Sequence, residues 1–373
     1  MLLTLSAQAR VITVGPQGEL QRIAQAADIA QDGDVIEIAA GVYLGDVAVW
    51  KQKQLTLRGV GGRPVLMAGG RSAEGKAIWV IRNGSFSVSN LEFRGSRVPD
   101  GNGAGIRFER GSLSVRDCVF EDNQNGILTS NFSDAVLSIE NTRFAKAPQQ
   151  SKPPPHLLYV GQIDQVRIRG SRFESGYVGH LIKSRARRSE LHYNLIHDGP
   201  SGRASYEVEF PNGGQVTLVG NIIEQGPDRS NSALIAYGAE GRFWPENRLD
   251  MAHNTVINDG LLPAWFLRAW TSTFAAGLEF NSYNNLWIGL GFRSPGLTGV
   301  TRGDVHGWRH QLKAPRDLDF RLDDASEMPG GAAVPIDDLR PTDEFSLPIG
   351  VRPIARPSAW LPGAIQSSTA KRL

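Results

Sequence analysis

The sequence lacks several features that would each point to a particular class of protein. Its single cysteine, Cys118, excludes an intrachain disulfide and a cysteine-rich zinc site. The 40 lysines and arginines are balanced by 38 aspartates and glutamates, so overall charge does not favour binding to nucleic acid. No apolar run approaches the roughly 20 residues that a membrane-spanning helix needs. We therefore expect neither nucleic acid nor membrane insertion, and we expect a monomer.

The composition also excludes a disordered chain, because 40% of the residues are hydrophobic and only 21% are charged. The chain opens with MLLTLSAQA, whose apolar stretch ends in Ala7-Gln8-Ala9 and is similar to the end of a secretory signal. It is short and lacks a basic start, so either the native start lies upstream of Met1 or the likeness is accidental. We interpret residues 1–9 as a signal-peptide remnant and expect a periplasmic or secreted protein.

A short pattern returns along the middle of the chain. An alternating apolar and polar segment is followed by Asn, Asp or Gly in most copies, and then by a closing apolar residue. A period of about 20 to 50 residues indicates a solenoid, a propeller or an array. The closing residues are Phe93, Phe120, Phe144, Phe173, Ile196, Ile223, Val256 and Trp287.

The segments within each period choose among these architectures. They are short and alternate with period two, which is typical of strands, and no helix-pair period is present. Asn, Asp and Gly tolerate the left-handed backbone conformation of sharp bends between strands. The pattern predicts an all-β chain, a right-handed parallel β-helix of about nine or ten coils over residues 10–330. The helical spacing of Leu20–Ile29, before a first strand in residues 34–43, predicts an N-terminal capping helix. Residues 331–373 are expected to form an extended strap on the solenoid.

Three further motifs carry a resemblance to known proteins. The opening motif runs from Gly33 to Tyr43, with the sequence GDVIEIAAGVY. The closing motifs are Asp319-Phe320-Arg321-Leu322 before Ser326, and Gly363-Ala364-Ile365-Gln366. With these motifs the chain resembles the pectate-lyase-like group of right-handed parallel β-helix proteins, over nearly its whole length. These motifs specify the fold well and the function poorly.

One basic region stands out from the balanced chain. Between Asp164 and Arg203 there are eight basic residues against four acidic ones, a local charge of +4, and four of the seven histidines lie in the surrounding segment 156–240. A basic strip suits an acidic polymer such as a uronic-acid polysaccharide. The alternative is an ordinary solvated face.

A constant register step, equal to the spacing from His156 to His180, places the polar side chains of this region. It sets His156 over His180, Tyr159 over Lys183 and Glu207, and Gly161 over Arg185 and Glu209. Coils of a β-helix lie about 4.8 Å apart. We therefore expect Lys183 to meet Glu207, and Arg185 to meet Glu209, on one exposed face. His156 and His180 have the opposite parity, so they lie at the strand mouth or point inward.

The functional interpretation is a catalytic strip for a polysaccharide lyase. Removal of the proton next to a uronate carboxylate needs a base and a cation that neutralises the carboxylate. The candidate catalytic residues are Lys183, Arg185, His180, His156, Tyr159, Glu207 and Glu209. The candidate substrate-binding residues are Arg187, Tyr206, Asn212, Tyr237 and Trp244. The alternative is a charge ladder between adjacent strands, worth roughly 0.2–1 kcal/mol per pair.

A narrower resemblance concerns the stretch IKSRARRSELHYNLI followed by LVGNII. It is similar to the Lys-Ser stretch of the chondroitinase-B and alginate-lyase family of β-helix lyases, and this resemblance implies that Lys183 is the base. That family's catalytic arginine before His-Gly is replaced here by the run from Glu209 to Gly214. Its calcium-binding acids are also missing, since Gly176 and Val178 stand at their place. The sequence therefore assigns no metal site, and the cofactor stays open, with calcium unsupported.

Two other functions stay open. Glu207 and Glu209, two apart on one strand, would lie roughly 7 Å apart at a rise of 3.3 Å per residue, which falls in the range of inverting glycosidases. Their basic neighbours would lower both pKa values, which is wrong for a general acid. The third reading is a non-catalytic polysaccharide-binding β-helix, in which tryptophans such as Trp244 stack on sugar rings.

Overall fold

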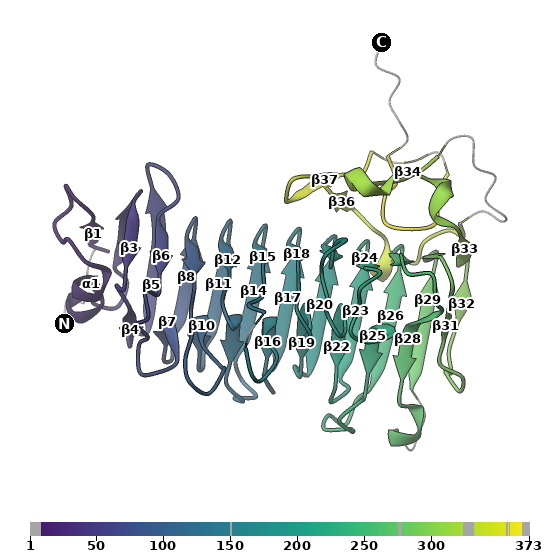
Figure 1. Ribbon diagram of the computed structural model, residues 1–373, viewed down its shortest axis with the longest axis horizontal. Coiled ribbons are helices and arrows are strands. Elements are labelled where there is room, and N and C mark those ends of the chain that lie inside the picture. The colour runs from purple at the N-terminus through teal and green to yellow at the C-terminus, as the bar shows by residue number, and fades with distance from the viewer. Residues whose placement is uncertain are drawn as a thin grey trace, which may run out of the picture.

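The computed structural model describes residues 9–149, 151–274, 278–323, 332–355, 357 and 359–367. Within them the chain winds as a parallel β-solenoid, and Figure 1 shows its coils side by side along the long axis. Each complete coil contributes one strand to each of three sheets, so neighbours in a sheet come from successive coils. The predicted all-β solenoid is confirmed.

Sheet 1 has twelve strands. They are β1 (Val11–Val14), β2 (Val35–Ala39), β5 (Gln54–Val60), β8 (Ser85–Ser89), β11 (Ser112–Arg116), β14 (Val136–Glu140), β17 (Gln165–Arg169), β20 (Arg188–His192), β23 (Gln215–Val219), β26 (Arg248–Ala252), β29 (Glu279–Tyr283) and β32 (Thr301–Arg302).

Sheet 2 has eleven strands. They are β3 (Val42–Leu44), β6 (Val65–Met67), β9 (Glu92–Arg94), β12 (Val119–Glu121), β15 (Arg143–Ala145), β18 (Arg172–Glu174), β21 (Leu195–His197), β24 (Ile222–Gln225), β27 (Thr255–Asn258), β30 (Leu286–Ile288) and β33 (Val305–Gly307).

Sheet 3 has ten strands, and it carries the candidate site. They are β4 (Ala48–Trp50), β7 (Ala77–Ile81), β10 (Ala104–Phe108), β13 (Asn125–Thr129), β16 (His156–Val160), β19 (Ile182–Ser184), β22 (Val208–Phe210), β25 (Ala233–Tyr237), β28 (Ala264–Ala269) and β31 (Gly291–Arg293).

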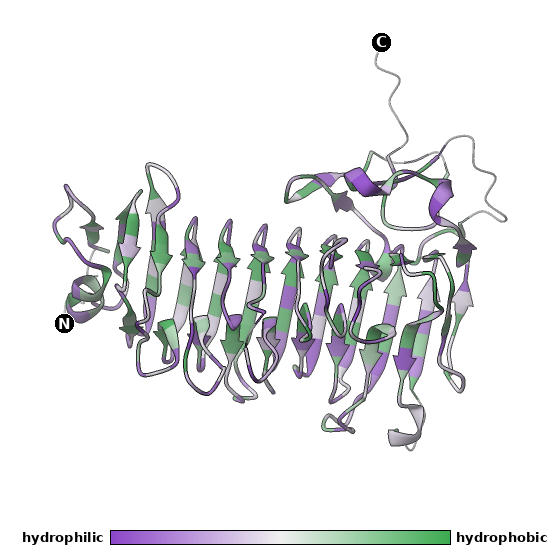
Figure 2. Cartoon of the chain, viewed as in Figure 1, coloured by the Kyte–Doolittle hydropathy of each residue, from purple (hydrophilic) through white to green (hydrophobic). Residues whose placement is uncertain are grey.

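The predicted closing residues of the repeat are the anchors of sheet 2. Each pairs with the next along the sheet, from Phe93 to Trp287. The first four rings form a stack inside the solenoid, with centroids 5.0, 4.8 and 4.7 Å apart. Figure 2 shows hydrophobic and hydrophilic residues mixed along the strands, as expected where one face of each sheet is buried. Stacking of coils therefore gives one continuous core.

From β5 onward, the residue that follows each sheet 1 strand makes the predicted sharp bend. Asn90, Asp117, Asn141 and Asn284 have φ between 48° and 55°, and Gly170 and Gly220 are likewise left-handed. Just inside the bend, asparagine side chains bond from coil to coil. Asn221 Oδ1, for example, accepts from Asn194 Nδ2 at 2.9 Å, and Asn221 Nδ2 donates to Asn254 Oδ1 at 2.9 Å. At the bends, these contacts thus satisfy the hydrogen-bonding needs of buried backbone groups and of the side-chain amides together.

The N-terminal helix is shorter than predicted and does not precede the first strand. Helix α1 spans Ile23–Ile29 and buries Ile23, Ala26 and Ala27 in the core. Strand β1 comes before it and pairs in parallel with β2, because the alternating run VITV already has one buried face. The expected first strand, residues 34–43, divides into β2 and β3. That α1 caps the solenoid stays a prediction.

The C-terminal segment, defined as residues 332–355, 357 and 359–367, lies against the bends between sheets 1 and 2. Gly350 N donates to Gly170 O at 2.9 Å, Arg169 pairs with Asp343 at 2.8 Å, and Thr342 N donates to Tyr193 Oη at 3.0 Å. Figure 1 shows this segment folded back over the later coils. The division of the chain at residue 330 stays a prediction, and residues 1–8, Ser326 and the boundary itself lie outside the described residues.

The remaining elements are short. The antiparallel pairs are β34 (Leu312–Ala314) with β35 (Asp319–Leu322), and β36 (Asp343–Phe345) with β37 (Val351–Pro353). The 3₁₀ turns are Thr271–Thr273, Arg309–Gln311, Pro315–Asp317 and Asp337–Leu339. In the part of the chain that the structure describes, no helix is both long and apolar enough to span a bilayer.

Candidate functional site

The basic strip lies on sheet 3, across β16, β19 and β22. Tyr159 pairs with Lys183 and Leu158 with Ile182, which confirms the first predicted register step. The next step is longer than the first, so Lys183 lies opposite Glu209 and not Glu207. The predicted pairing of Lys183 with Glu207 is wrong. The cause is the length of the turn after β21. The step from Lys183 to Glu209 in sheet 3 takes more residues than the preceding step from Glu174 to His197 in sheet 2.

Lys183 and Arg185 form one cation pair that binds two carboxylates and a phenol. Lys183 Nζ lies 2.8 Å from Glu240 Oε1 and 3.1 Å from Glu209 Oε2. The Arg185 guanidinium contacts the other oxygen of Glu240 and the hydroxyl of Tyr159. The predicted contact of Arg185 with Glu209 is therefore replaced by one with Glu240, which comes from the loop after β25. Sequence periodicity missed Glu240, because it lies 57 residues from Lys183 outside every strand.

The two carboxylates of this cluster differ in their environment. Glu209 is 3% exposed, and burial raises its pKa although Lys183 opposes the shift. Glu240 is more open, and burial alone would raise its pKa. Hydrogen bonds from Lys183 and Arg185 outweigh burial, so the pKa of Glu240 is lowered. Lys183 is thus held between one carboxylate inside the wall and one at the surface.

The two histidines lie beside the cluster, at the start of the strands, as their parity predicted. Burial, with a contribution from Lys183 and Arg185, lowers the pKa of His156 to about 3 and that of His180 well below 6.5. Both are therefore neutral at neutral pH. His156 Nδ1 accepts the backbone N–H of His180 at 3.0 Å, so its proton is on Nε2. His180 Nδ1 lies 3.1 Å from Glu209 Oε2, outside good hydrogen-bond geometry.

A groove of about 680 Å³ runs along sheet 3 beside this cluster. Its walls include His156, Tyr159, Lys183 and Arg185, all of which the sequence singled out. It also contains residues that the sequence missed: Gly101, Asn102, Arg107, Asn125, Leu128, Thr129, Ser130, Asn131, Pro153, Pro154 and Gln162.

Arg107 belongs to the same register column as Tyr159 and Lys183, through Leu128. The step from Arg107 to Leu128 is shorter than the step from Leu128 to Tyr159, however, so a constant period does not lead to it.

Glu207 is the largest departure from the expected site. It is fully buried, although it was predicted to be exposed. One of its oxygens accepts from Gln225 Nε2 at 2.9 Å and the other has no partner. Burial, together with Asp198, raises its pKa well above 4.5, so its surroundings favour the neutral form. Glu207 does not line the groove, and it forms no exposed pair with Glu209.

The predicted substrate-binding residues are scattered. Tyr237 is fully buried and its hydroxyl donates to Gly214 O at 2.5 Å. The prediction that Tyr237 binds substrate is therefore wrong. Trp244 is buried and its Nε1 donates to Arg185 O at 3.0 Å, which makes it a support of the loop that carries Glu240. Arg187 is bound to Asp164, whose Oδ1 lies 2.5 Å from Nη2. Tyr206 packs edge-on to His180, and Asn212 is mostly buried near Gln162.

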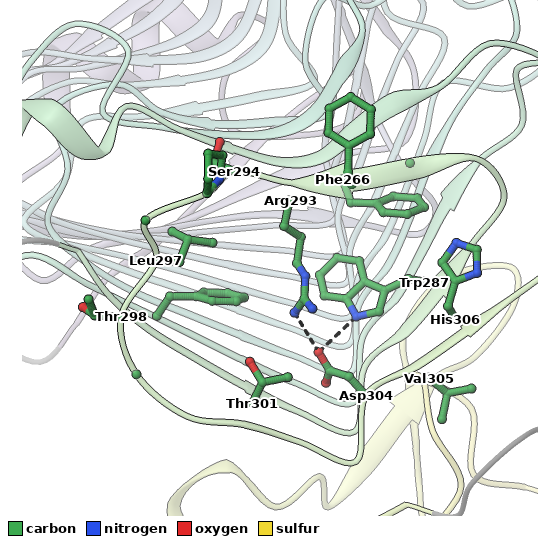
Figure 3. A pocket seen from close by; sticks show the side chains of 16 residues that line it. Phe266, Trp287, Arg293, Ser294, Leu297, Thr298, Thr301, Asp304, Val305 and His306 are labelled. Atoms are coloured by element: carbon green, nitrogen blue, oxygen red, sulfur yellow. Dashed lines mark hydrogen bonds and ion pairs between the residues drawn. The ribbon is translucent and has the colours of Figure 1, made fainter.

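A second cavity, of about 580 Å³, lies at the C-terminal end of the solenoid. Figure 3 shows Arg293 beside the Trp287 ring, with Asp304 bound to both. Asp304 also accepts from Ser282 and Asn285 and ends the asparagine ladder. This cavity is the end of the hydrophobic core, and its charged pair is already neutralised. The groove on sheet 3 is the better candidate for chemistry.

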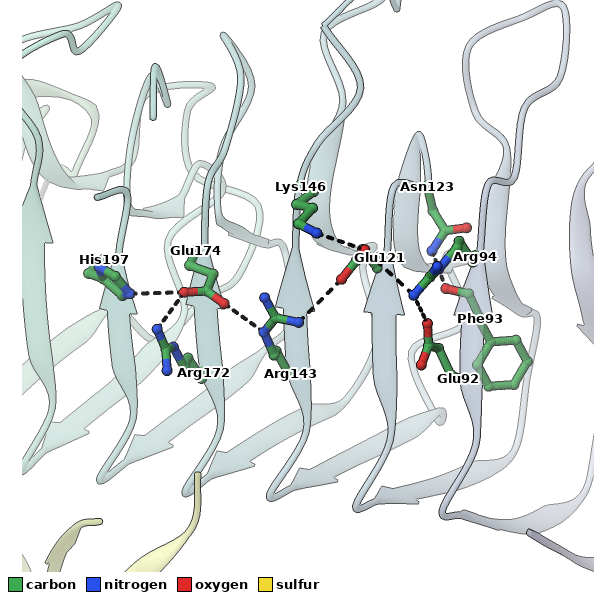
Figure 4. Close-up of polar contacts among 10 residues, drawn as sticks. All are labelled: Glu92, Phe93, Arg94, Glu121, Asn123, Arg143, Lys146, Arg172, Glu174 and His197. Atoms are coloured by element: carbon green, nitrogen blue, oxygen red, sulfur yellow. Dashed lines mark hydrogen bonds and ion pairs between the residues drawn. The ribbon is translucent and has the colours of Figure 1, made fainter. Parts of the chain in front are cut away.

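The outer face of sheet 2 carries a ladder of ion pairs, shown in Figure 4. Glu121 is bound by Arg143 and Lys146, and Glu174 by Arg143 and Arg172. Burial alone would raise the pKa of Glu174, but the hydrogen bonds from His197 and Arg143 and the charge of Arg172 lower it to about 2. The charges alternate and are mutually satisfied, as in a structural charge ladder between adjacent strands.

The described residues contain no group of three or more histidine, cysteine or acidic side chains placed to hold a metal ion. At the positions where the β-helix lyases carry calcium ligands, Gly176 N donates to Asp198 Oδ1 and Val178 is a half-exposed turn residue. The residues at this place do not fit a calcium site.

Comparisons with known proteins bear on the architecture of the chain. No protein-family model matches the sequence, and no relative was found among curated proteins. The solved structure of pectate lyase Pel9A superimposes with a TM-score of 0.65 at 11% identity, over 97% of each chain. Lacto-N-biosidase from Eubacterium ramulus reaches 0.47 at 10% identity, over 80% of this chain and 68% of that one. An alginate lyase from Paenibacillus sp. str. FPU-7 reaches 0.43 at 13% identity, over 79% and 99%. The superposition on Pel9A shows that the chain has the right-handed parallel β-helix fold of the pectate-lyase-like kind.

Proposed function

We propose that this protein is a polysaccharide lyase that cleaves an acidic, uronic-acid-containing polysaccharide by β-elimination. The observation that carries the proposal is the cationic groove on sheet 3, where Arg107, Lys183 and Arg185 line one cavity together with a neutral histidine and a tyrosine. A fold shared with a pectate lyase supports the reaction class. We further propose that the protein acts in the periplasm or outside the cell, in keeping with the apolar start of its sequence.

Arg185 is assigned to the substrate carboxylate. A guanidinium binds a carboxylate through two parallel hydrogen bonds and neutralises the charge that grows as the neighbouring C5–H proton leaves. Arg107 lies on the same groove wall and would hold the carboxylate of an adjacent sugar. Its Nη2 donates to Ser130 Oγ at 3.0 Å, while its buried Nε has no partner.

Lys183 is assigned as the base, as the resemblance to the β-helix lyases implies. A base must carry a lone pair, so the lysine must first lose a proton. Glu209 is the acceptor for that proton, because it lies 3.1 Å from Nζ and burial raises its pKa. The neutral amine then takes the C5 proton, the electron pair forms the C4=C5 double bond, and the C4–O bond breaks.

The leaving oxygen needs a proton as the bond breaks, and the Tyr159 hydroxyl is assigned to supply it. The side chain is half-buried on the groove wall, with its ring centroid 5.8 Å from Lys183 Nζ and its hydroxyl held by Arg185. His156 presents Nε2–H and donates a hydrogen bond to a sugar hydroxyl. No water is consumed, so the products together have the mass of the substrate.

A panel of acidic polysaccharides tests the proposal. The purified protein is incubated with polygalacturonate, alginate, hyaluronate and chondroitin, and the absorbance of the C4=C5 double bond is followed. Rising absorbance with no added water in the product mass is the expected result. A product heavier by one water refutes the lyase assignment. Binding without any product would favour the passive binding β-helix.

A hydrolase is the second candidate, and one observation favours it. Glu209 and Glu240 both contact Lys183, and their pKa values are shifted in opposite directions. Such a divergence is how sites separate a general acid from a general base. Glu209 would be the acid and Glu240 the base. This pair replaces the predicted pair of Glu207 and Glu209, since Glu207 is buried. Neither carboxylate lines the groove, which is why the lyase is preferred.

A further inference from the structure

The Glu240 side chain takes up hydrogen-bonding positions that Lys183 and Arg185 would otherwise offer to a ligand carboxylate. Its Oε1 lies 2.8 Å from Lys183 Nζ, and its Oε2 is bound by the Arg185 guanidinium. One carboxylate thus satisfies both cations, with one oxygen for each. The charge and shape are those of the acidic group of a uronate.

We infer that Glu240 is an internal carboxylate that occupies the Lys183–Arg185 site until the carboxylate of an acidic sugar displaces it. This competition sets the affinity of the groove for acidic substrates. This inference rests on the proposed function, because it needs an acidic ligand in the groove. It adds a residue that controls access to the site.

Exposure decides which partner moves. The Glu240 side chain is 41% exposed, while those of Lys183 and Arg185 are 10% and 16% exposed. The cations are embedded in the sheet wall and the carboxylate faces solvent. A partly exposed ion pair contributes little net stability, since water competes for both charges. An incoming carboxylate therefore replaces Glu240 without moving the cations.

The backbone around Glu240 stays in place during this exchange. Glu240 N donates to Pro211 O at 2.9 Å, Phe243 N donates to Asn212 O at 3.1 Å, and Trp244 Nε1 is anchored on Arg185 O. The movement is a rotation of the Glu240 side chain, which crosses barriers on a ps–ns timescale when the residue is exposed. The loop does not have to open.

Both cations keep a partner after Glu240 leaves. Lys183 retains Glu209 at 3.1 Å, and Arg185 retains the Tyr159 hydroxyl. No buried cation is left unpaired, so the severe cost of breaking a buried ion pair does not apply. The formal charge of Arg107, Lys183, Arg185, Glu209 and Glu240 together is +1, and it rises to +2 once Glu240 points away. The groove becomes more attractive to the anion that displaces it.

The test compares Glu240→Gln with the wild-type protein. Glutamine has the same shape but no charge, so it competes weakly for the cations. The dissociation constants of trigalacturonate and trimannuronate are measured by calorimetry, with fully methyl-esterified trigalacturonate as the neutral ligand. We expect E240Q to bind an acidic trimer about tenfold tighter, which is about 1.4 kcal/mol. Binding of the neutral ester stays unchanged, and KM for the acidic polymer falls more than kcat changes.

Two variants sharpen the result. Glu240→Asp keeps the charge but shortens its reach, so its gain should be smaller than that of E240Q. Glu246→Gln is the matched control, because Glu246 is exposed in the same loop and is bound to Gln215 at 2.6 Å, away from the cations. E246Q should bind like the wild-type protein.

The outcomes separate the inference from the proposed function. If E240Q binds acidic trimers no tighter than the wild-type protein while Lys183→Met loses them, the displacement is refuted and the groove assignment stands. Loss of activity in E240Q together with a hydrated wild-type product identifies Glu240 as a catalytic base and also refutes it. If neither protein binds an acidic ligand, the proposed function itself fails, and the inference with it.

Discussion

Replacing Lys183 by methionine should weaken the fold as well as the reaction, and the cost should depend on pH. The substitution leaves Glu209 at 3% exposure with His180 as its nearest neighbour, and that histidine is neutral. Removing one partner of a buried pair costs about 3–5 kcal/mol when the other charge stays. Protonation of Glu209 limits this cost. It requires about 1.4 kcal/mol for each pH unit above the unfolded pKa of about 4.3.

The sign follows from linkage. A carboxyl whose pKa is raised in the folded state contributes full stability below its unfolded pKa and loses it as the pH rises through the folded pKa. Because burial already raises the pKa of Glu209 in the wild-type protein, the deficit of K183M relative to it should be at most about 1 kcal/mol at pH 5 and should grow toward about 3–5 kcal/mol at pH 8. Urea denaturation followed by far-ultraviolet circular dichroism at both pH values measures it, with the exposed Lys51→Met as control.

The double variant K183M/E209Q isolates the cause. Glutamine cannot carry the stranded charge, so stability at pH 8 should return to within about 1 kcal/mol of the wild-type protein while activity stays lost. A K183M deficit that is equal at pH 5 and pH 8 would refute the reasoning. So would a double variant that is as unstable as the single one.

Three further predictions address the groove, the buried acid and the core. Arg107→Gln should weaken binding of polygalacturonate about three- to tenfold at low salt and less in about 0.5 M salt, as measured by KM at both salt concentrations, because screening weakens the lost attraction. Glu207→Gln should leave activity intact and become steadily more stable than the wild-type protein in urea titrations as pH rises above about 4.3, since the raised pKa of Glu207 removes stability in that range. A loss of turnover in E207Q would restore Glu207 to the site. Phe144→Ala should cost about 3–5 kcal/mol in thermal or urea unfolding, because its ring stacks between Phe120 and Phe173, and Phe144→Leu should cost less.

The fold could be predicted from the sequence because each coil repeats the same short pattern of residues. A left-handed residue after the sheet 1 strand, then an apolar anchor such as Phe120 or Phe144, recurs from bend to bend. The exceptions are informative. Tyr193 and His253 stand at left-handed positions where Asn or Gly was expected, and both are covered by the C-terminal segment. Their aromatic rings pack against the C-terminal segment, whose position no local sequence pattern predicts.

Only part of the site could be predicted from the sequence, because the positions of its residues depend on turn lengths. Sheet 3 begins after the turns that vary most, so the step from Tyr159 to Lys183 was right and the step from Lys183 to Glu207 was too short. Parity then placed Glu207 at the surface, whereas that end of the coil is closed by Gln225 and its neighbours. Glu240 belongs to a loop, and loops carry no period. Only three-dimensional contact reveals that it neutralises Lys183 and Arg185.

The C-terminal segment changes how such a coil stack can come apart. A plain solenoid holds each coil only by its neighbours, so it can unzip from either end one coil at a time. Here Thr342 is bound to Tyr193 across 149 residues of sequence, and Gly363 N donates to Asn284 O further along the stack. The coils between these two points cannot unfold separately until the C-terminal segment dissociates from them. The late coils should therefore melt as one block with the segment, and the unclamped early coils should fray first.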